Sequence, residues 1–94
     1  MKTKKWIKGY DGIYSITTKG VITNELTGLR LRPYCANKDN PLLRVKLCKD
    51  GVMRNLYVHK LVASSFLKKP KNCTRVTHIN SNVYNNSIDN LMWV

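Results

Sequence analysis

The chain has 94 residues, which is long enough for one compact domain or for two small subdomains that share a core. A hydrophobic fraction of 43% is ordinary for a globular protein and excludes wholesale disorder. The 17 Lys and Arg residues outnumber the 5 Asp and Glu residues, and the formal net charge of +12 excludes an electrostatically neutral surface.

The basic residues are spread along the chain, which indicates a folded basic face rather than a disordered tail. Nucleic acid is the first candidate partner of such a face, and an anionic membrane surface is the second. No stretch has the length and apolar character of a membrane span, so we expect no membrane partner. A basic surface can also serve solubility alone, and composition leaves that alternative open.

The three cysteines, Cys35, Cys48 and Cys73, form no close pair. The first residues are polar and rich in Lys, without the apolar run of a secretory signal. We therefore expect free thiols and a reducing, cytoplasmic location. A zinc site that combines Cys48 and Cys73 with His59 and His78 is conceivable, although the paired cysteine spacing of a zinc knuckle is absent.

Residues 6–32 are expected to form short antiparallel strands. Apolar and polar side chains alternate over residues 13–17, which is the period of a half-buried strand. Lys19-Gly20 and Thr27-Gly28 are turn signals because glycine tolerates positive φ angles. The segments VITN and LRLRP then supply the returning strands.

Residues 42–58 predict a hairpin. Leu43, Val45 and Leu47 share one face of the first strand, whereas Arg44 and Lys46 lie on the other. An Asp-Gly turn leads into the partner strand VMRNLYV. The predicted sheet therefore has one apolar face and one basic face.

Over residues 58–67 the spacing of hydrophobic residues changes to that of an α-helix. Pro70 lies shortly beyond the expected end of this helix. The expected apolar face consists of Val58, Leu61, Val62, Ser65 and Phe66. A basic loop, a short strand CTRVTHI and an Asn-rich loop follow. In the last segment, SIDNLMWV, Ser87 suits the cap of a short helix, whereas Asp89-Asn90 favours a turn.

These elements predict an α+β fold, with a small antiparallel β-sheet, one packing helix and a C-terminal strand-and-loop element. Within it, WIKGYDGIYSITTKGVITN resembles the nuclease-associated modular domain at the N-terminus of many phage HNH endonucleases. The matching residues are Trp6, Gly9, Tyr10, Gly12, Tyr14, Ile16 and Gly20, with Thr17 in place of Ser.

The stretch from Tyr57 to Val94 resembles the HNH module itself. The matching residues are His59, Leu61, Val62, Ala63, Phe66, Pro70, Val76, His78, Ile79, Asn85, Asn86, Asn90, Leu91, Trp93 and Val94. Together the two stretches cover nearly the whole chain, in the order and spacing of phage-type HNH homing endonucleases. The resemblance implies a β-rich DNA-recognition module at 1–56 and a C-terminally truncated HNH module, a partial ββα-metal element, at 57–94.

The resemblance also implies catalytic roles. His78 would be the general base that activates water, and Asn90 would orient the loop and that histidine. A divalent cation, Mg²⁺ or Mn²⁺, would stabilise the leaving oxygen if the chain is active, although no cofactor is certain. Thr77 stands where relatives carry an acidic or polar ligand, and the chain ends at Val94, before the segment of the distal ligand. We therefore expect an incomplete nuclease site, with no metal ligand assigned.

Basic and amide side chains are the expected contacts with DNA phosphates and base edges. They are Lys68, Lys69 and Lys71 of the basic loop, with Arg44, Lys46, Arg54, Arg75, Asn82, Asn85 and Asn86. Asn-rich loops can equally satisfy turn geometry, and His59 can be a packing residue of the helix. Trp6, Tyr10, Tyr14 and Trp93 can stack on bases or build the core.

Three hypotheses for function remain open. The first is a protein that binds double-stranded DNA and retains an incomplete HNH nuclease site. The second is an active, metal-dependent endonuclease or nickase. The third is a phage effector that uses the same fold to bind an acidic protein of its bacterial host.

Overall fold

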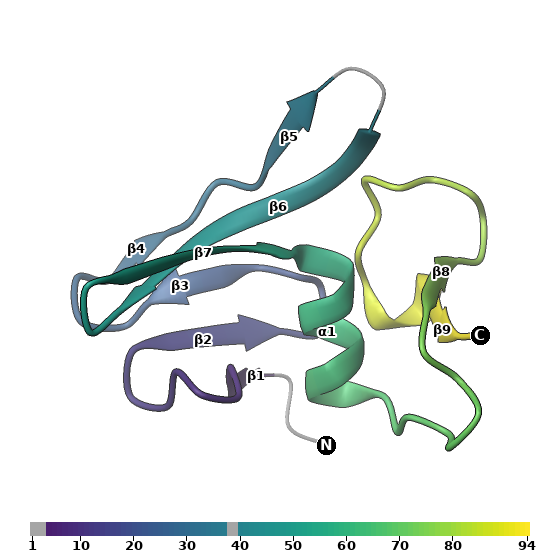
Figure 1. Cartoon of the computed structure of the whole chain (residues 1–94), viewed down its shortest axis with the longest axis horizontal. Helices are drawn as coiled ribbons and strands as arrows, with labels where there is room; N and C mark the ends of the chain where they lie inside the picture. Colours follow the sequence, from purple (N-terminus) through teal and green to yellow (C-terminus); the bar gives the residue numbers. More distant parts are fainter. Residues whose placement is uncertain (1–3, 38–39) are drawn as a thin grey trace.

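The computed structural model describes residues 4–37 and 40–94. Its first sheet has the strand order β1-β2-β3-β4, and its second has the order β5-β6-β7. A two-stranded sheet pairs β8 with β9, and all these pairings are antiparallel (Figure 1). The strands are β1 (Lys4–Trp6), β2 (Tyr14–Thr17), β3 (Ile22–Asn24), β4 (Leu29–Arg30), β5 (Tyr34–Asn37), β6 (Asn40–Lys49), β7 (Val52–Tyr57), β8 (Val76–His78) and β9 (Leu91–Trp93).

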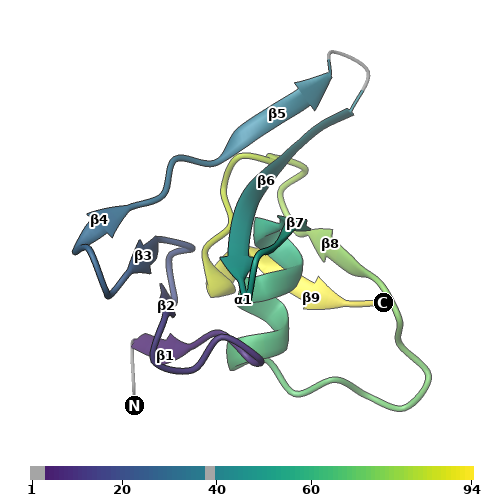
Figure 2. The same ribbon diagram turned by 60° about the vertical axis from the view of Figure 1, so that its left-hand side comes forward.

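A single α-helix in the described part of the chain, α1 (Val58–Phe66), follows β7 directly and contacts strands of all three sheets. Figure 2 shows β8 and β9 beside this helix. The helix confirms the prediction for residues 58–67, but its buried side is rotated from the expected one. Leu61, Ser65 and Phe66 are only half-buried, whereas His59 on another side of the helix is buried against His78 of β8. The buried helix residues are Val58, His59, Val62 and Ala63.

One hydrophobic core joins the sheets and the helix. Its buried members are Ile7, Tyr14, Ile16, Ile22, Val45, Leu47, Val58, Val62 and Leu91. The Tyr14 hydroxyl also accepts a hydrogen bond from the backbone N–H of Cys48, at 3.1 Å, which ties the first sheet to β6. Residues of both predicted modules thus pack into the same core, and the division at residue 56 stays a prediction.

The hairpin predicted over residues 42–58 is confirmed as β6 and β7, with Val45 and Leu47 buried and Lys46 exposed on the other face. Strands β1, β5 and β9 were not expected. At the C-terminus, a one-turn 3₁₀ helix, η1 (Ile88–Asn90), precedes β9, and the Ser87 side chain makes no capping hydrogen bond. None of the helices in the described part of the chain combines the length and apolar character of a membrane span.

Candidate functional site

His78 ends β8 and is 8% exposed. Its Nε2 atom lies 2.7 Å from Oδ1 of Asn86, which is itself buried. An amide oxygen can only accept a hydrogen bond, so Nε2 carries the proton of the neutral ring. The lone pair then lies on Nδ1, which is the nitrogen able to take a proton from water or from a ligand.

Asn90 fixes the loop between β8 and η1. Its Oδ1 accepts from the backbone N–H of Asn80, and its Nδ2 donates to the backbone carbonyl of Asn85, each at 3.0 Å. Both ends of the loop are therefore held by one buried amide. The orienting role expected of Asn90 fits this geometry for the loop, whereas the direct partner of His78 is Asn86.

Sequence reasoning had placed Asn86 among the DNA contacts. The structure puts its side chain in the interior, 6% exposed and bonded to His78, while the adjacent Asn85 is exposed. Two successive asparagines give no sign of which one is turned inward, because that choice depends on the packing of the whole loop.

The turn between β2 and β3 packs against this loop. The N–H of Ile88 donates to the carbonyl of Thr18 at 2.8 Å. Gly20 has a φ angle of +84°, and a Cβ there would lie 3.3 Å from both Cβ and O of Asn86. The first sheet thus helps to position the residue that holds His78.

His59 lies between Tyr57 and His78. It is 4% exposed, and its ring centroid lies 5.1 Å from that of His78 and 5.4 Å from that of Tyr57. Burial is the main cause that lowers the pKa of His59 from 6.5 to about 4, and the charges of His78 and Lys60 add to the effect. His59 is therefore a neutral packing ring at physiological pH.

The solvent-facing side of the second sheet carries cations beside aromatic rings. The Arg44 guanidinium lies 4.9 Å from the Tyr57 ring centroid and its Nη2 donates to the Tyr57 hydroxyl at 3.1 Å. Lys46 Nζ lies 5.8 Å from the Tyr34 ring centroid, and the Tyr34 hydroxyl donates to Oδ1 of Asn55 at 2.5 Å. We call Tyr34, Arg44, Lys46, Asn55 and Tyr57 the aromatic–basic face.

The aromatic–basic face is continuous with the His78 site. Tyr57 contacts Arg44 on one side and His59 on the other, and His59 contacts His78. The Nε atom of Arg44 is buried and has no hydrogen-bond acceptor among the described residues.

The other expected DNA contacts are dispersed. Arg54 pairs with Leu47 and so lies on the opposite side of the sheet from Arg44. It lines a separate cleft of about 380 Å³ at the β6–β7 turn, together with Lys8 and Lys49.

Near β8 and β9, Lys69 Nζ lies 5.6 Å from the Trp93 ring centroid, and Arg75 is exposed. Lys68 and Lys71 are exposed in the basic loop after α1. Asn82 and Asn85 are exposed, and their side-chain oxygens accept backbone N–H groups of the Asn-rich loop, as turn residues do.

The described residues do not fit a hard divalent cation by themselves. No group of three or more His, Cys, Asp or Glu side chains comes together anywhere in residues 4–37 and 40–94. Thr77, next to His78, offers a neutral hydroxyl where a carboxylate would attract Mg²⁺ or Mn²⁺. The conceivable zinc set is likewise not assembled, although His59 and His78 are neighbours.

No established family model matches the sequence. The chain is 34% identical over 80 residues to an uncharacterized HNH endonuclease of Acanthamoeba polyphaga mimivirus, a match covering 85% of this chain and 24% of that protein. It is 34% identical over 90 residues to DNA endonuclease I-HmuI of Bacillus phage SP01, covering 96% of this chain and 51% of that protein.

A solved structure of DNA binding and cleavage by the HNH homing endonuclease I-HmuI superposes on the whole chain with a TM-score of 0.86. The sequence identity is 34%, and the match covers 52% of the solved chain. The chain thus spans about half or less of the length of these relatives.

Proposed function

From the premise that this chain is a homologue of the HNH endonucleases, we propose that it binds double-stranded DNA through the aromatic–basic face, beside His78. The I-HmuI relative binds and cleaves DNA, and its fold matches this one over the whole chain. The net charge of +12 favours a polyanionic partner. The expected place of action, the cytoplasm of a bacterial host cell, is part of this proposal.

The observation that carries the proposal is the continuous row of contacts from Arg44 through Tyr57 and His59 to His78. A phosphate bound by the Arg44 guanidinium, beside the Tyr57 ring, would extend the backbone of the duplex toward His78. Lys46 lies two residues further along β6, where it would contact a neighbouring phosphate.

Duplex binding can be tested with a matched pair of variants. Arg44→Ala removes the donor beside Tyr57, and Arg30→Ala removes the same charge from an exposed position on β4 of the other sheet. We expect Arg44→Ala to weaken binding of a labelled duplex by about tenfold or more, because charged hydrogen bonds are among the strong ones. Arg30→Ala should cost less, and equal losses would mean that the charge acts without a specific face.

We propose further that the described residues cleave DNA poorly by themselves. His78 offers Nδ1 as a base, with Asn86 holding the opposite edge of its ring. Proton transfer by a general base accelerates a reaction by only about a hundred- to ten-thousand-fold. The described residues assemble no carboxylate site beside His78 that would stabilise the charge on a scissile phosphate.

Binding to the alternative partner, an acidic host protein, would also weaken as the salt concentration rises. The two partners can be distinguished by nuclease treatment of a cell extract, which would leave a directly bound host protein in place. Duplex DNA of mixed sequence should compete for the aromatic–basic face if the proposal is correct.

A further inference from the structure

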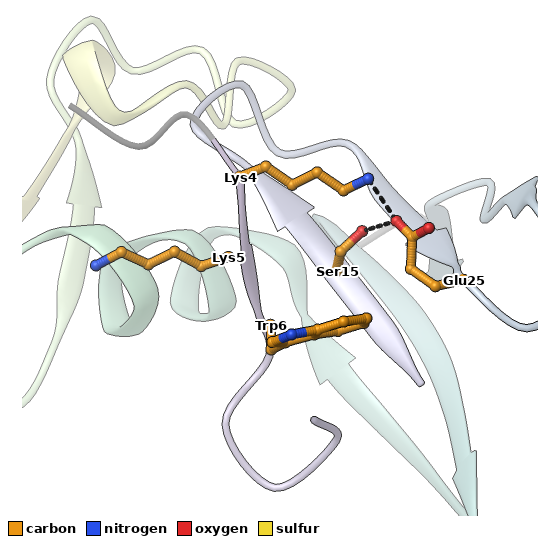
Figure 3. Close-up of a pocket in the computed structure, with 5 residues that line it drawn as sticks. All are labelled: Lys4, Lys5, Trp6, Ser15 and Glu25. Atoms are coloured by element: carbon orange, nitrogen blue, oxygen red, sulfur yellow. Dashed lines mark hydrogen bonds and ion pairs between the residues drawn. The ribbon is translucent and has the colours of Figure 1, made fainter. Parts of the chain in front are cut away.

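A second cleft lies on the outward side of the first sheet, on the side of β1 and β2 away from α1. Lys4 and Trp6 of β1, Ser15 of β2 and Glu25 after β3 line it, together with Lys5, and its volume is about 290 Å³. Figure 3 shows Lys4, Trp6, Ser15 and Glu25 gathered on one side of the strands, whereas Lys5 extends the other way. Lys5 Nζ donates to the Ser65 carbonyl of α1 at 3.1 Å.

Trp6 supplies an aromatic surface to this cleft. Its side chain lies directly across from Ser15 in the strand pairing, and 47% of the residue is exposed. The other tryptophan, Trp93, is half-buried and donates its indole N–H to the Leu67 carbonyl at 3.3 Å. Exposed aromatic rings on sheets serve single-stranded nucleic-acid binders as stacking platforms, because every base has a flat face.

Glu25 supplies a fixed acceptor beside the ring. Its Oε1 accepts from Lys4 Nζ at 2.6 Å and from the Ser15 hydroxyl at 2.5 Å (Figure 3). Hydrogen bonds from Lys4 and then from Ser15 lower the pKa of Glu25, so the carboxylate is ionised near neutral pH. Its Oε2 makes no hydrogen bond or ion pair with the described residues and is not buried. This oxygen can therefore accept a hydrogen bond from a ligand.

We propose that this cleft binds one unpaired nucleotide, with its base stacked on Trp6 and an exocyclic amino group donating to Glu25. A cationic ligand would be repelled by Lys4 and by the net charge of +12, whereas a nucleotide brings a phosphate that the charge attracts. The base must be unpaired, since stacking and pairing in a duplex cover its faces and edge. The cleft shares no residue with the aromatic–basic face, so this inference does not depend on duplex binding.

The carboxylate implies a preference among bases. Cytosine presents an amino group at the position where thymine presents a carbonyl oxygen, and a carboxylate accepts from the first and repels the second. Oligo(dC) and oligo(dT) of equal length therefore form a matched pair of ligands. Electrostatic attraction to the backbone is the same for both, so any difference between them reports on the base.

The test is fluorescence anisotropy of labelled oligo(dC) and oligo(dT) at one salt concentration. We expect the protein to bind oligo(dC) about fivefold more tightly, the effect of about one hydrogen bond. Glu25→Gln should bring the ratio close to one, because an amide can both donate and accept. Trp6→Ala should weaken both ligands by about tenfold, and Trp6→Phe should restore much of that loss.

Equal affinity of the native protein for the two oligonucleotides would overturn the role of Glu25. A Trp6→Ala variant that binds oligo(dC) as the native protein does would overturn the stacking site. If Glu25→Gln fails to fold, NMR of the native protein with dCMP and with dTMP decides. The Trp6 indole N–H signal should shift more with dCMP, and equal or absent shifts would contradict the proposal.

Discussion

The Asn86 side chain holds the His78 ring through a hydrogen bond of 2.7 Å that is shielded from solvent, with the two residues 6% and 8% exposed. The geometry directs the free lone pair of the imidazole away from Asn86, so the orientation of the ring is set by a neighbour eight residues along the chain.

Replacing Asn86 by Ala should destabilise the protein by about 1–3 kcal/mol, because the Nε2–H of His78 loses its acceptor in a buried place. Urea denaturation measures the change. Asn85→Ala is the control: that residue is exposed, and its side chain accepts one hydrogen bond, from the Ser87 N–H at 3.3 Å. Equal losses in the two variants would contradict the special role of Asn86.

Stability should rise with pH between about 4 and 6.5 because of His59. The folded pKa of His59, about 4, lies below its ordinary value of 6.5, so the unfolded chain binds more protons in this window. This contribution is complete above pH 6.5 and is lost as the pH falls. His59→Phe keeps a ring against Tyr57 and His78 but cannot titrate. The melting temperature of the variant should depend less on pH than that of the native protein, and parallel curves would refute the assignment.

The basic loop should contribute to the salt dependence of DNA binding. Neutralising about five phosphates gives a slope of log K against log salt of about −4 to −5. Replacing Lys68, Lys69 and Lys71 by Ala should reduce that slope by about three and weaken binding to all sequences alike. A charge-matched control replaces three exposed cations of the first sheet and its turns: Lys19, Arg30 and Arg32. An unchanged slope in the loop variant would mean that the loop faces away from DNA.

Leu47→Ala should destabilise the fold more than Phe66→Ala. Leu47 has no exposed surface in the core, and such truncations cost about 2–5 kcal/mol. The helical pattern, which places Phe66 on the apolar face, predicts a loss of about 3–5 kcal/mol for Phe66→Ala if that face is buried. In the structure, however, Phe66 is half-buried, with Lys5 Nζ 5.4 Å above its ring, so its loss should be smaller. Urea denaturation of both variants gives the order.

Incubation of a supercoiled plasmid with excess protein and Mg²⁺ or Mn²⁺ should give no nicking that depends on His78. General-base help is small beside the total acceleration of about a million-fold or more that enzymes supply. The His78→Ala variant is the control for contaminating nuclease. Metal-dependent nicking that disappears in this variant would instead support the endonuclease hypothesis.

Local sequence patterns were sufficient to predict those strands and helices whose signals lie within a few consecutive residues. The alternation around Val45 and Leu47, with the Asp-Gly turn, predicts β6 and β7, and the helical period predicts α1. Strand β1 was not predicted because Lys4 and Lys5 give no alternation of apolar and polar residues. Its strand conformation comes from antiparallel pairing with β2. Strand β9 was missed because Leu91 is placed by pairing with His78, thirteen residues earlier in the sequence.

The candidate site divides in the same way. The motif that contains His78 and Asn90 is readable in the sequence, since it consists of residue types at fixed spacing. The contact of His59 with His78, and that of Tyr57 with Arg44, arise only when α1 packs beside β8 and when β6 pairs with β7. The sequence pattern therefore locates the motif, but it does not predict which side chains from other elements pack beside it.

The close approach of Gly20 to Asn86 limits how this protein can diverge by recombination. A cassette exchange that imported a different first sheet would also import the turn between β2 and β3. Any side chain at position 20 would meet Asn86 at 3.3 Å, in a backbone conformation with φ of +84° that few residues adopt. A graft at the predicted boundary between the two modules would therefore have to keep glycine at this place in the turn, or else shift Asn86, which holds His78.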